Sequence, residues 1–272
     1  MKKVSIIMGV YNCKDIRRLR ASIDSIIGQT YTDWEFLICN DGSTDETLSE
    51  LKKIEQIDER IKVISYFPNR GLAYALNQCI LLAEGQYIAR QDDDDISEPE
   101  RLACQVKFMD AHPEYSVVGT AAKVFDDNGI WGKYEVEEQP TKKTFLWNSP
   151  FIHPTVMMRK DALKEAGCYR VAKETRRCED YDLFMRMYAM NNIGYNIQSE
   201  LYQYRIENGN KKYRPMKYRI DEAIVRYIGF KRMGMFPGAI PYVIKPILIG
   251  LIPQSIFKKI RRQQYNRNDT KG

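Results

Sequence analysis

The stretch YIARQDDDD, residues 87–95, places four consecutive aspartates almost directly after a short apolar run of strand type. Like charges this close raise one another's pKa and repel, so the cluster costs stability unless a positive charge lies among them. A hard divalent ion such as Mg²⁺ or Mn²⁺ binds carboxylate oxygens and often takes substrate phosphates as further ligands. We therefore expect a metal and an anionic ligand to meet here. The alternative is a solvated acidic turn.

The residues around this stretch alternate short strand-type runs with helical periodicity. This alternation is typical of an α/β fold in which helices flank a mostly parallel sheet. The expected strands are Val4–Met8, Phe36–Cys39, Lys62–Tyr66, Tyr87–Ala89, Ser116–Gly119 and Pro154–Met158, with a loop or hairpin over Asp126–Lys143. The expected helices have apolar stripes over 16–27, 48–54, 72–83, 162–167, 181–191 and 218–230.

Local motifs predict where some helices begin and end. Ser43 with Glu46, and Ser97 with Glu100, have the spacing of capping boxes. Gly85 has the place of a C′ glycine that ends the preceding helix. The aspartates are then expected in a strand-to-helix turn.

Two further polar turns follow predicted strands, GVYN at 9–12 and NDGS at 40–43. Ligands of open α/β sheets bind at the carboxyl ends of the strands, so these turns and the aspartates would form one site. Asp41 could accept a hydrogen bond from a nucleotide base while Tyr11 stacks on the ring. Alternatively, Asp41 caps the next helix and Tyr11 is a rim aromatic.

The aspartate spacing favours some cations over others. Asp92 and Asp94 can direct alternate carboxylates at one ion. An EF-hand calcium loop starting at Asp92 would require glycine and glutamate where the chain has Ser97 and Ala103. With two histidines and no Cys-x-x-Cys, the chain has little from which to build a zinc site. The six cysteines show no paired spacing and indicate reduced thiols of a cytosolic protein.

Two later motifs have a structural and a functional interpretation. Glu179 and Asp180 open an apolar-faced helix, where carboxylates interact favourably with the helix dipole. Alternatively, one of them projects into the site as a general base. His153 precedes Pro154 and a predicted strand, and is either a core histidine with satisfied hydrogen bonds or a site residue.

Together these motifs resemble glycosyltransferase family 2, whose members have the GT-A fold. The resemblance spans about residues 3–205, and the order and spacing of the motifs make it specific although each motif alone is weak. The motifs are VSII to Tyr11-Asn12, NDGSTD at 40–45, NRGL at 69–72 with Asn77, RQDDDD at 90–95 with Pro99, Arg101 and Leu102, HPT at 153–155, and EDYDL at 179–183.

The resemblance implies an inverting transfer of one sugar from a nucleotide-diphosphate sugar, usually a UDP-sugar, to a hydroxyl of a glycan or lipid-linked acceptor in polysaccharide or lipopolysaccharide biosynthesis. Asp41 matches the uracil-reading aspartate and Tyr11 the base-stacking position. Asp92 and Asp94 match the metal motif, with Mg²⁺ or Mn²⁺ as cofactor and Asp94 as the better ligand. Asp180 matches the catalytic base. The remaining substrate-binding candidates are Gly9, Arg70, Asp92, Asp93, His153 and Glu179.

The chemistry supports these roles independently. Inversion requires the acceptor oxygen to attack opposite the leaving UDP, so base and metal belong on opposite sides of the anomeric carbon. Proton transfer to Asp180 would be worth ~10²–10⁴ in rate, and the ion would neutralise charge on the diphosphate.

The chain departs from the family pattern at three places. Gly9 stands where Thr or Pro is common, which removes a side-chain contact from the base pocket. The Gln-x-x-Arg-Trp signature of processive enzymes is absent after Asp180, which predicts addition of a single sugar. Glu207 stands where many relatives have a nearby histidine, so a role for that loop in holding the diphosphate is in doubt.

The resemblance implies a catalytic domain over 1–210, divided near 115 into a nucleotide-sugar half and an acceptor half, and the rest of the chain, 211–272, is expected to be a helical, basic extension. Residues 231–272 hold nine Lys or Arg and one Asp. An apolar stretch followed by a basic end suits an anionic membrane, with contact expected over 235–265. The alternative is a subdomain packed on the core. A nucleic-acid partner is not expected, because no binding fold accompanies the basic cluster.

The N-terminal apolar run is too short for a signal peptide, and no stretch of ~20 apolar residues would span a bilayer. The expected location is therefore cytoplasmic, at the inner face of the cytoplasmic membrane. Two alternative functions are a sugar-nucleotide nucleotidyltransferase and a non-catalytic sugar-nucleotide-binding module. The first lacks its glycine-rich, Arg-containing N-terminal loop, and the intact Asp92, Asp94 and Asp180 argue against the second.

Overall fold

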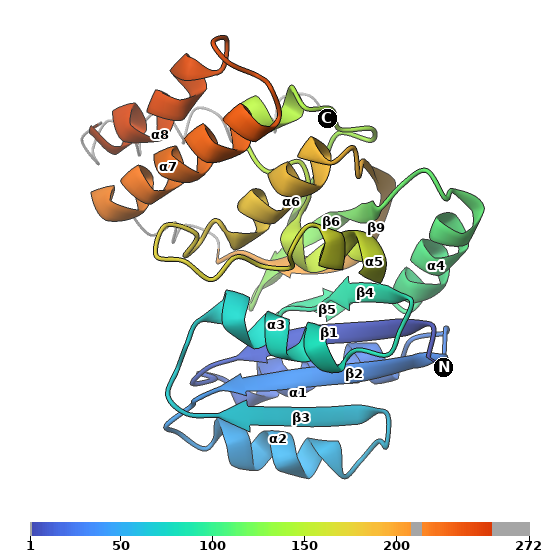
Figure 1. Cartoon of the computed structure of the whole chain (residues 1–272). Helices are drawn as coiled ribbons and strands as arrows, with labels where there is room; N and C mark the ends of the chain where they lie inside the picture. The colour runs from blue at the N-terminus through green and yellow to red at the C-terminus, as the bar shows by residue number, and fades with distance from the viewer. Residues whose placement is uncertain (1, 208–213, 252–272) are drawn as a thin grey trace.

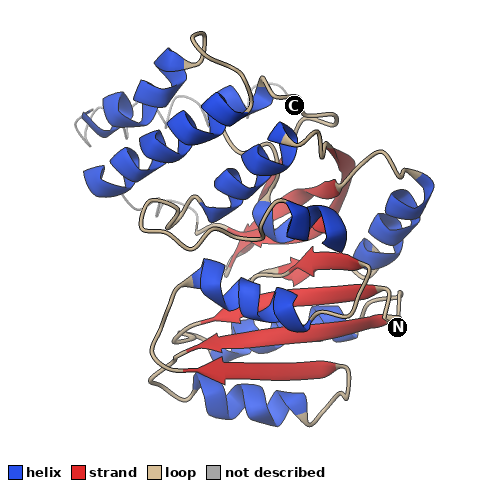
Figure 2. Ribbon diagram, viewed as in Figure 1, coloured by secondary structure: helices blue, strands red, loops and turns tan. Residues whose placement is uncertain are grey.

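The computed structural model describes residues 2–207 and 214–251. A nine-stranded sheet crosses the molecule, with helices on both faces (Figure 2). Its spatial order is β3 (Ile61–Tyr66), β2 (Trp34–Asp41), β1 (Val4–Val10), β4 (Tyr87–Arg90), β8 (Met157–Arg159), β6 (Val117–Asp126), β9 (Gly194–Arg205) and β5 (Ile96–Ser97), with β7 (Gly129–Tyr134) paired to β6. The α/β expectation is confirmed.

The first four strands of the sequence, β1 to β4, pair in parallel in the order β3-β2-β1-β4. Their side chains alternate between two buried layers, as the period of two requires. Ile6 and Phe36 pack toward α1 (Ile16–Ile27), α2 (Thr47–Glu55) and α4 (Arg101–Ala111). Ile7 and Leu37 pack toward α3 (Leu72–Leu82). Burial on both faces explains why β1, β2 and β4 read as continuous apolar runs, whereas the edge strand β3 exposes Lys62 and Ser65.

The rest of the sheet is mixed. β8 is antiparallel to β4 and β6, β9 is parallel to β6, and β5 is antiparallel to β9. The predicted hairpin begins where expected, because β6 and β7 pair across the turn from Asp126 to Gly129. The predicted strand over 154–158 is wrong at its start. His153–Thr155 form a 3₁₀ turn, in which the Thr155 amide donates to the Ile152 carbonyl, before β8 begins.

Both predicted capping boxes are wrong. α2 begins only at Thr47, whose amide donates to Asp45 Oδ1, while Ser43 Oγ accepts from the Asn12 amide. Ser97 lies in β5 and donates to Gln91 Oε1 at 2.8 Å instead of capping α4. In both cases another residue competes successfully for the serine hydroxyl, Asn12 at 31 residues from Ser43 and Gln91 at 6 residues from Ser97.

The prediction for Gly85 is also wrong. α3 ends in the extended residue Ala83, and Gly85 is not among the glycines with positive φ. It is needed for close approach instead, because a Cβ there would lie 2.5 Å from the Ser5 amide nitrogen. The Gly85 amide donates to Ser5 Oγ at 2.8 Å, which joins the start of β4 to β1.

The remaining helices are α5 (Lys160–Glu165), α6 (Glu179–Ala189), α7 (Met216–Arg232) and α8 (Ile240–Leu251). The first three lie within two residues of the predicted helices, and α8 lies in the extension that is expected to be helical. Figure 1 shows α7 and α8 side by side at the end of the molecule far from β2 and β3. No helix within 2–207 or 214–251 is both long and apolar enough to cross a membrane.

The predicted division near residue 115 does not interrupt the sheet, because β8, from the second half, pairs with β4, from the first. The predicted boundary at 210 and the basic residues after 251 lie outside the described residues.

Candidate active site

The acidic turn lies between the end of β4 at Arg90 and the start of β5 at Ile96. It is therefore a strand-to-strand turn. The prediction of a strand-to-helix turn is wrong, because the short strand β5 lies between the aspartates and α4. Asp95 is fully buried and accepts a hydrogen bond from the Arg205 amide at 2.7 Å. Burial, with Asp92 and Asp94 nearby, raises the pKa of Asp95 well above its usual range. Asp95 therefore links the acidic turn to the end of β9 inside the protein, which is a structural role.

Two fully buried arginines, Arg90 and Arg101, donate hydrogen bonds to residues at the start of the acidic turn. Arg90 donates to Asp92 Oδ1 and to the Gln91 carbonyl. Arg101 donates to the Arg90 carbonyl at 2.7 Å and to Gln91 Oε1 at 3.0 Å. Burying a cation is costly unless it is paired and hydrogen-bonded, so the geometry of the turn and the burial of these arginines depend on each other.

Asp93 and Asp94 keep the repulsion of the cluster, which nearby arginines offset only in part. Burial, followed by Asp94 and Asp92, raises the pKa of Asp93 to about 7, and Arg90 opposes this. Burial and Asp92 also raise the pKa of Asp94, against Arg205 and Arg18. Carboxylate oxygens with excess negative charge suit Mg²⁺ or Mn²⁺. Among the described residues no three His, Cys, Asp or Glu are arranged to hold a metal, so an ion here would need ligands from the diphosphate and water.

Glu179 and Asp180 open α6 with Asp182 in the same first turn. Burial raises the pKa of Asp180, and hydrogen bonds from the amides of the turn and from Ser149 oppose this. Burial and the neighbouring Asp180 raise the pKa of Glu179 to about 7. Asp182 faces elsewhere, because it is ion-paired with Arg170 and Arg186.

Two tyrosines connect the acidic turn with α6. Burial raises the pKa of Tyr204, and the charges of Asp92 and Asp180 both add to the effect. Burial likewise raises the pKa of Tyr169, with contributions from Asp180, Glu179 and Asp92. Each of these tyrosine hydroxyls therefore lies within electrostatic reach of both Asp92 and Asp180, although the two carboxylates belong to segments far apart in the chain.

His153 lies at the same place. Its Nε2 is 2.7 Å from Tyr169 Oη, and the two rings meet edge to face. Burial and the charge of Arg90 lower the pKa of His153 well below its usual value. The imidazole is therefore neutral, as expected for the satisfied core histidine, although it adjoins the site.

Asp41 organises the loop between β3 and α3. Its carboxylate accepts four hydrogen bonds of 2.6–2.8 Å, and Gly71 in this loop has a φ of 92°. The donors are Tyr66 Oη, Asn69 Nδ2 and the amides of Arg70 and Gly71. The alternative that Asp41 caps α2 is wrong, because its carboxylate accepts from residues before α3, while the first amide of α2, that of Thr47, donates to Asp45. Its role in reading a base remains a prediction, as does stacking by Tyr11, which is half exposed.

Gly9 and Arg70 are positioned by α3. A Cβ at Gly9 would lie 2.9 Å from Leu72 Cδ1 and 3.2 Å from Ala75 Cβ, so this glycine allows the helix to approach β1. The guanidinium of Arg70 is exposed, lies 4.0 Å from the centre of the Tyr74 ring and donates to its hydroxyl at 2.7 Å.

An ion network that the motifs did not predict lies beside the turn. Arg205 donates to the Asp94 carbonyl at 3.1 Å and pairs with Asp127 at 2.9 Å. Arg18 pairs with Asp127 and, at 3.2 Å, with Glu207. Glu207 is thus part of a network that braces Asp94. Tyr169, Ser149 and Asp127 gave no local signal, because isolated polar residues in loops have no period or spacing.

Comparison with known proteins identifies the protein family to which the chain belongs. Residues 5–167 match glycosyl transferase family 2. The chain is 40% identical over 263 residues to the putative glycosyltransferase EpsE of Bacillus subtilis, covering 96% of this chain and 94% of EpsE. It is 33% identical over 190 residues to the Escherichia coli UDP-Glc:alpha-D-GlcNAc-diphosphoundecaprenol beta-1,3-glucosyltransferase WfgD, covering 70% of this chain and 71% of WfgD. The chain belongs to glycosyltransferase family 2.

The structure of S. aureus TarS residues 1–349 in complex with UDP-GlcNAc superposes with a TM-score of 0.69 at 19% identity, covering 89% of this chain and 73% of that one. This likeness is one of fold, and it confirms the expected GT-A fold, an α/β architecture with a mostly parallel, curled sheet flanked by helices.

Proposed function

We propose that this protein is an inverting glycosyltransferase that moves a single sugar from a UDP-sugar to a hydroxyl of a glycan or lipid-linked oligosaccharide in polysaccharide or lipopolysaccharide biosynthesis. The observation that carries the proposal is that Tyr204 and Tyr169, the latter hydrogen-bonded to His153, lie within electrostatic reach of both Asp92 and Asp180. One group of carboxylates suits a cation and a diphosphate, and the other suits a general base. WfgD, whose name states a UDP-Glc donor and a diphosphoundecaprenol-linked acceptor, supports the choice of substrates.

The donor would bind along the carboxyl ends of β1, β2 and β4. Tyr11, half exposed, would stack on the base. Asp41 would accept from a base N–H in exchange for one of its four present donors, of which the Arg70 amide belongs to an exposed residue and the Tyr66 hydroxyl to a partly buried one. Gly9 would contribute through its backbone, since the direction of its missing Cβ faces α3.

Asp94 and Asp92 would hold Mg²⁺ or Mn²⁺, with Asp93 toward the ribose or the metal. The ion would neutralise the charge that develops on the departing UDP. The raised pKa of Asp93 and Asp94 supports this role, because an added cation relieves the repulsion that raises it.

Asp180 would accept the proton of the acceptor hydroxyl as its oxygen forms the new bond to the anomeric carbon and the bond to UDP breaks on the opposite face. A raised pKa suits a base that works near neutral pH. Glu179 and neutral His153 would line the acceptor side. We place the reaction at the inner face of the cytoplasmic membrane, where a lipid-linked acceptor would be embedded.

The test is a panel of UDP-, GDP- and dTDP-sugars, measured by calorimetric titration with and without Mn²⁺ or Mg²⁺ and by slow donor hydrolysis. UDP-sugars should bind and be hydrolysed only with the metal present. Preference for a GDP- or dTDP-sugar would correct the donor alone. Failure to bind any nucleotide sugar with metal present would sink the proposal.

A further inference from the structure

The helix pair α7–α8 exposes two apolar stripes. On α7 the exposed apolar residues are Ile220, Ile224 and Tyr227, three and four positions apart. On α8 they are Ile240, Ile244, Leu248 and Leu251, with exposed fractions of 43–67%. This spacing places each set along one side of its helix. Soluble surfaces rarely collect large apolar side chains in this way.

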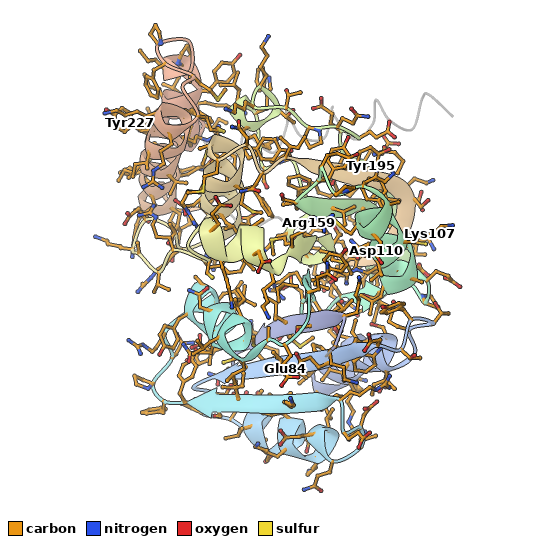
Figure 3. The ribbon with its side chains drawn as sticks, turned by 45° about the vertical axis from the view of Figure 1, so that its right-hand side comes forward. Glu84, Lys107, Asp110, Arg159, Tyr195 and Tyr227 are labelled. Carbon is orange, nitrogen blue, oxygen red and sulfur yellow. The ribbon has the colours of Figure 1, made fainter. Side chains whose placement is uncertain are left out.

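Both stripes face away from the catalytic domain. Arg226 of α7 donates to the Leu146 carbonyl at 2.9 Å and to the Trp147 carbonyl at 3.1 Å, and Lys245 of α8 donates to the Trp147 carbonyl at 3.0 Å. These residues mark the inner sides of the two helices, and the stripes occupy other sides at 100° per residue. Figure 3 shows Tyr227 at the outer edge of α7.

The charges around the stripes have one sign. The exposed side of α7 continues in both directions into cations, Lys217 before Ile220 and Lys231 after Tyr227. The two acidic residues of α7, Asp221 and Glu222, are buried, and Glu222 pairs with Arg214 and Arg226. α8 contains no acidic residue. An apolar face bordered by cations complements an anionic bilayer, which takes apolar side chains between its headgroups and attracts Lys and Arg.

We propose that the exposed face of α7–α8, formed by Ile220, Ile224, Tyr227, Ile240, Ile244, Leu248 and Leu251, docks on an anionic membrane surface. The inference deepens the proposed function by assigning the surface that contacts the membrane. Only the biological role of this contact, access to lipid-linked acceptors, rests on the proposed function. Lys245 lies 4.7 Å from the centre of the Trp147 ring, and Ser149, two residues later, interacts with Asp180. The docked helices would therefore hold the acceptor side of the site next to lipid-linked acceptors.

The test is co-sedimentation of the full chain with vesicles of phosphatidylcholine alone or with added phosphatidylglycerol, without donor or acceptor. The wild-type chain should bind the anionic vesicles and not the neutral ones. The double substitution Ile224→Glu with Leu248→Glu should weaken this binding about tenfold or more, because each change removes apolar burial and adds a repelled charge. The control is Ile57→Glu, at an apolar residue beside α2 that is 65% exposed, against 41% for Ile224 and 57% for Leu248, and this variant should bind as the wild type does.

Several results would overturn the inference. One is a wild-type chain that ignores anionic vesicles, and another is a double variant that binds them unchanged. A wild-type dimer that the double variant converts to a monomer, with no vesicle binding, would assign the face to a second copy of the chain. Nucleotide-sugar binding is measured on the same samples. It distinguishes a failure of membrane docking from a failure of the proposed activity, and it shows whether the variants are folded.

Discussion

Arg90, fully buried below the acidic turn, donates to the carboxylate of Asp92 two residues later. This contact divides the aspartates by environment. Asp92 has an internal cation, and Asp95 accepts from the Arg205 amide. Asp93 and Asp94 keep the repulsion that a bound ion would relieve. Stability and metal-dependent binding should therefore respond differently to substitutions only two positions apart.

We expect Asp94→Asn to abolish metal-dependent donor binding while raising the free energy of unfolding of the metal-free protein by up to about 1 kcal/mol, because a repelled charge is removed. Asp92→Asn should also weaken donor binding but lower the free energy of unfolding by about 1–3 kcal/mol, because it leaves buried Arg90 without its anion. Urea unfolding with EDTA and donor titration with Mn²⁺ measure both. Asp24→Asn, on an exposed position of α1, is the control. Equal stability changes in the two variants would contradict the division.

Asp180→Asn should lower kcat by about 10²–10⁴ and leave the Kd of the donor unchanged, because only the proton acceptor is lost. Glu179→Gln is the matched comparison at the adjacent residue, and it should retain most of kcat. Initial rates of transfer and donor titration separate the two effects. Wild-type rates in Asp180→Asn, or a larger loss in Glu179→Gln, would move the base away from Asp180.

The raised pKa of Glu179 predicts a pH dependence of stability. In the folded protein this carboxyl titrates at about 7, above its usual value of 4.5, because of burial and Asp180. The folded state thus binds more protons than the unfolded state between those values, and ionising Glu179 costs stability as pH rises through 7. The Tm with EDTA should fall between about pH 5 and about pH 8, and Glu179→Gln should flatten this slope. Exposed Glu59→Gln should not, and an unchanged slope in both variants would exclude Glu179 as its source.

Gly9→Ala should lower the free energy of unfolding by about 1–3 kcal/mol, because the added methyl group crowds Leu72 and Ala75. Gly132→Ala is the matched control, since nothing lies within 4 Å of a Cβ there. Urea unfolding measures both. If Gly9→Ala were as stable as the wild type but bound donor more weakly, Gly9 would act in donor contact and not in helix packing.

Much of the fold follows from local pattern. The predicted strands over 4–8, 36–39, 62–66 and 87–89 all occur, each longer by one to four residues. All but the edge strand over 62–66 are buried on both faces and therefore leave an unbroken apolar run. Helix boundaries were less predictable. Ser43 and Ser97 have the spacing of caps, yet Asn12 and Gln91 take their hydroxyls.

The amino-acid sequence by itself determined the α/β architecture, the family, and the acidic cluster with Asp180 as candidates, because periodicity and motif order are properties of the chain. Only the tertiary structure decided which carboxylates share surroundings. Arg90 neutralises Asp92, Tyr169 and Tyr204 lie near both Asp92 and Asp180, and α7 and α8 turn their apolar stripes outward. These relationships depend on burial and on distances between segments far apart in the chain, and no local pattern encodes either.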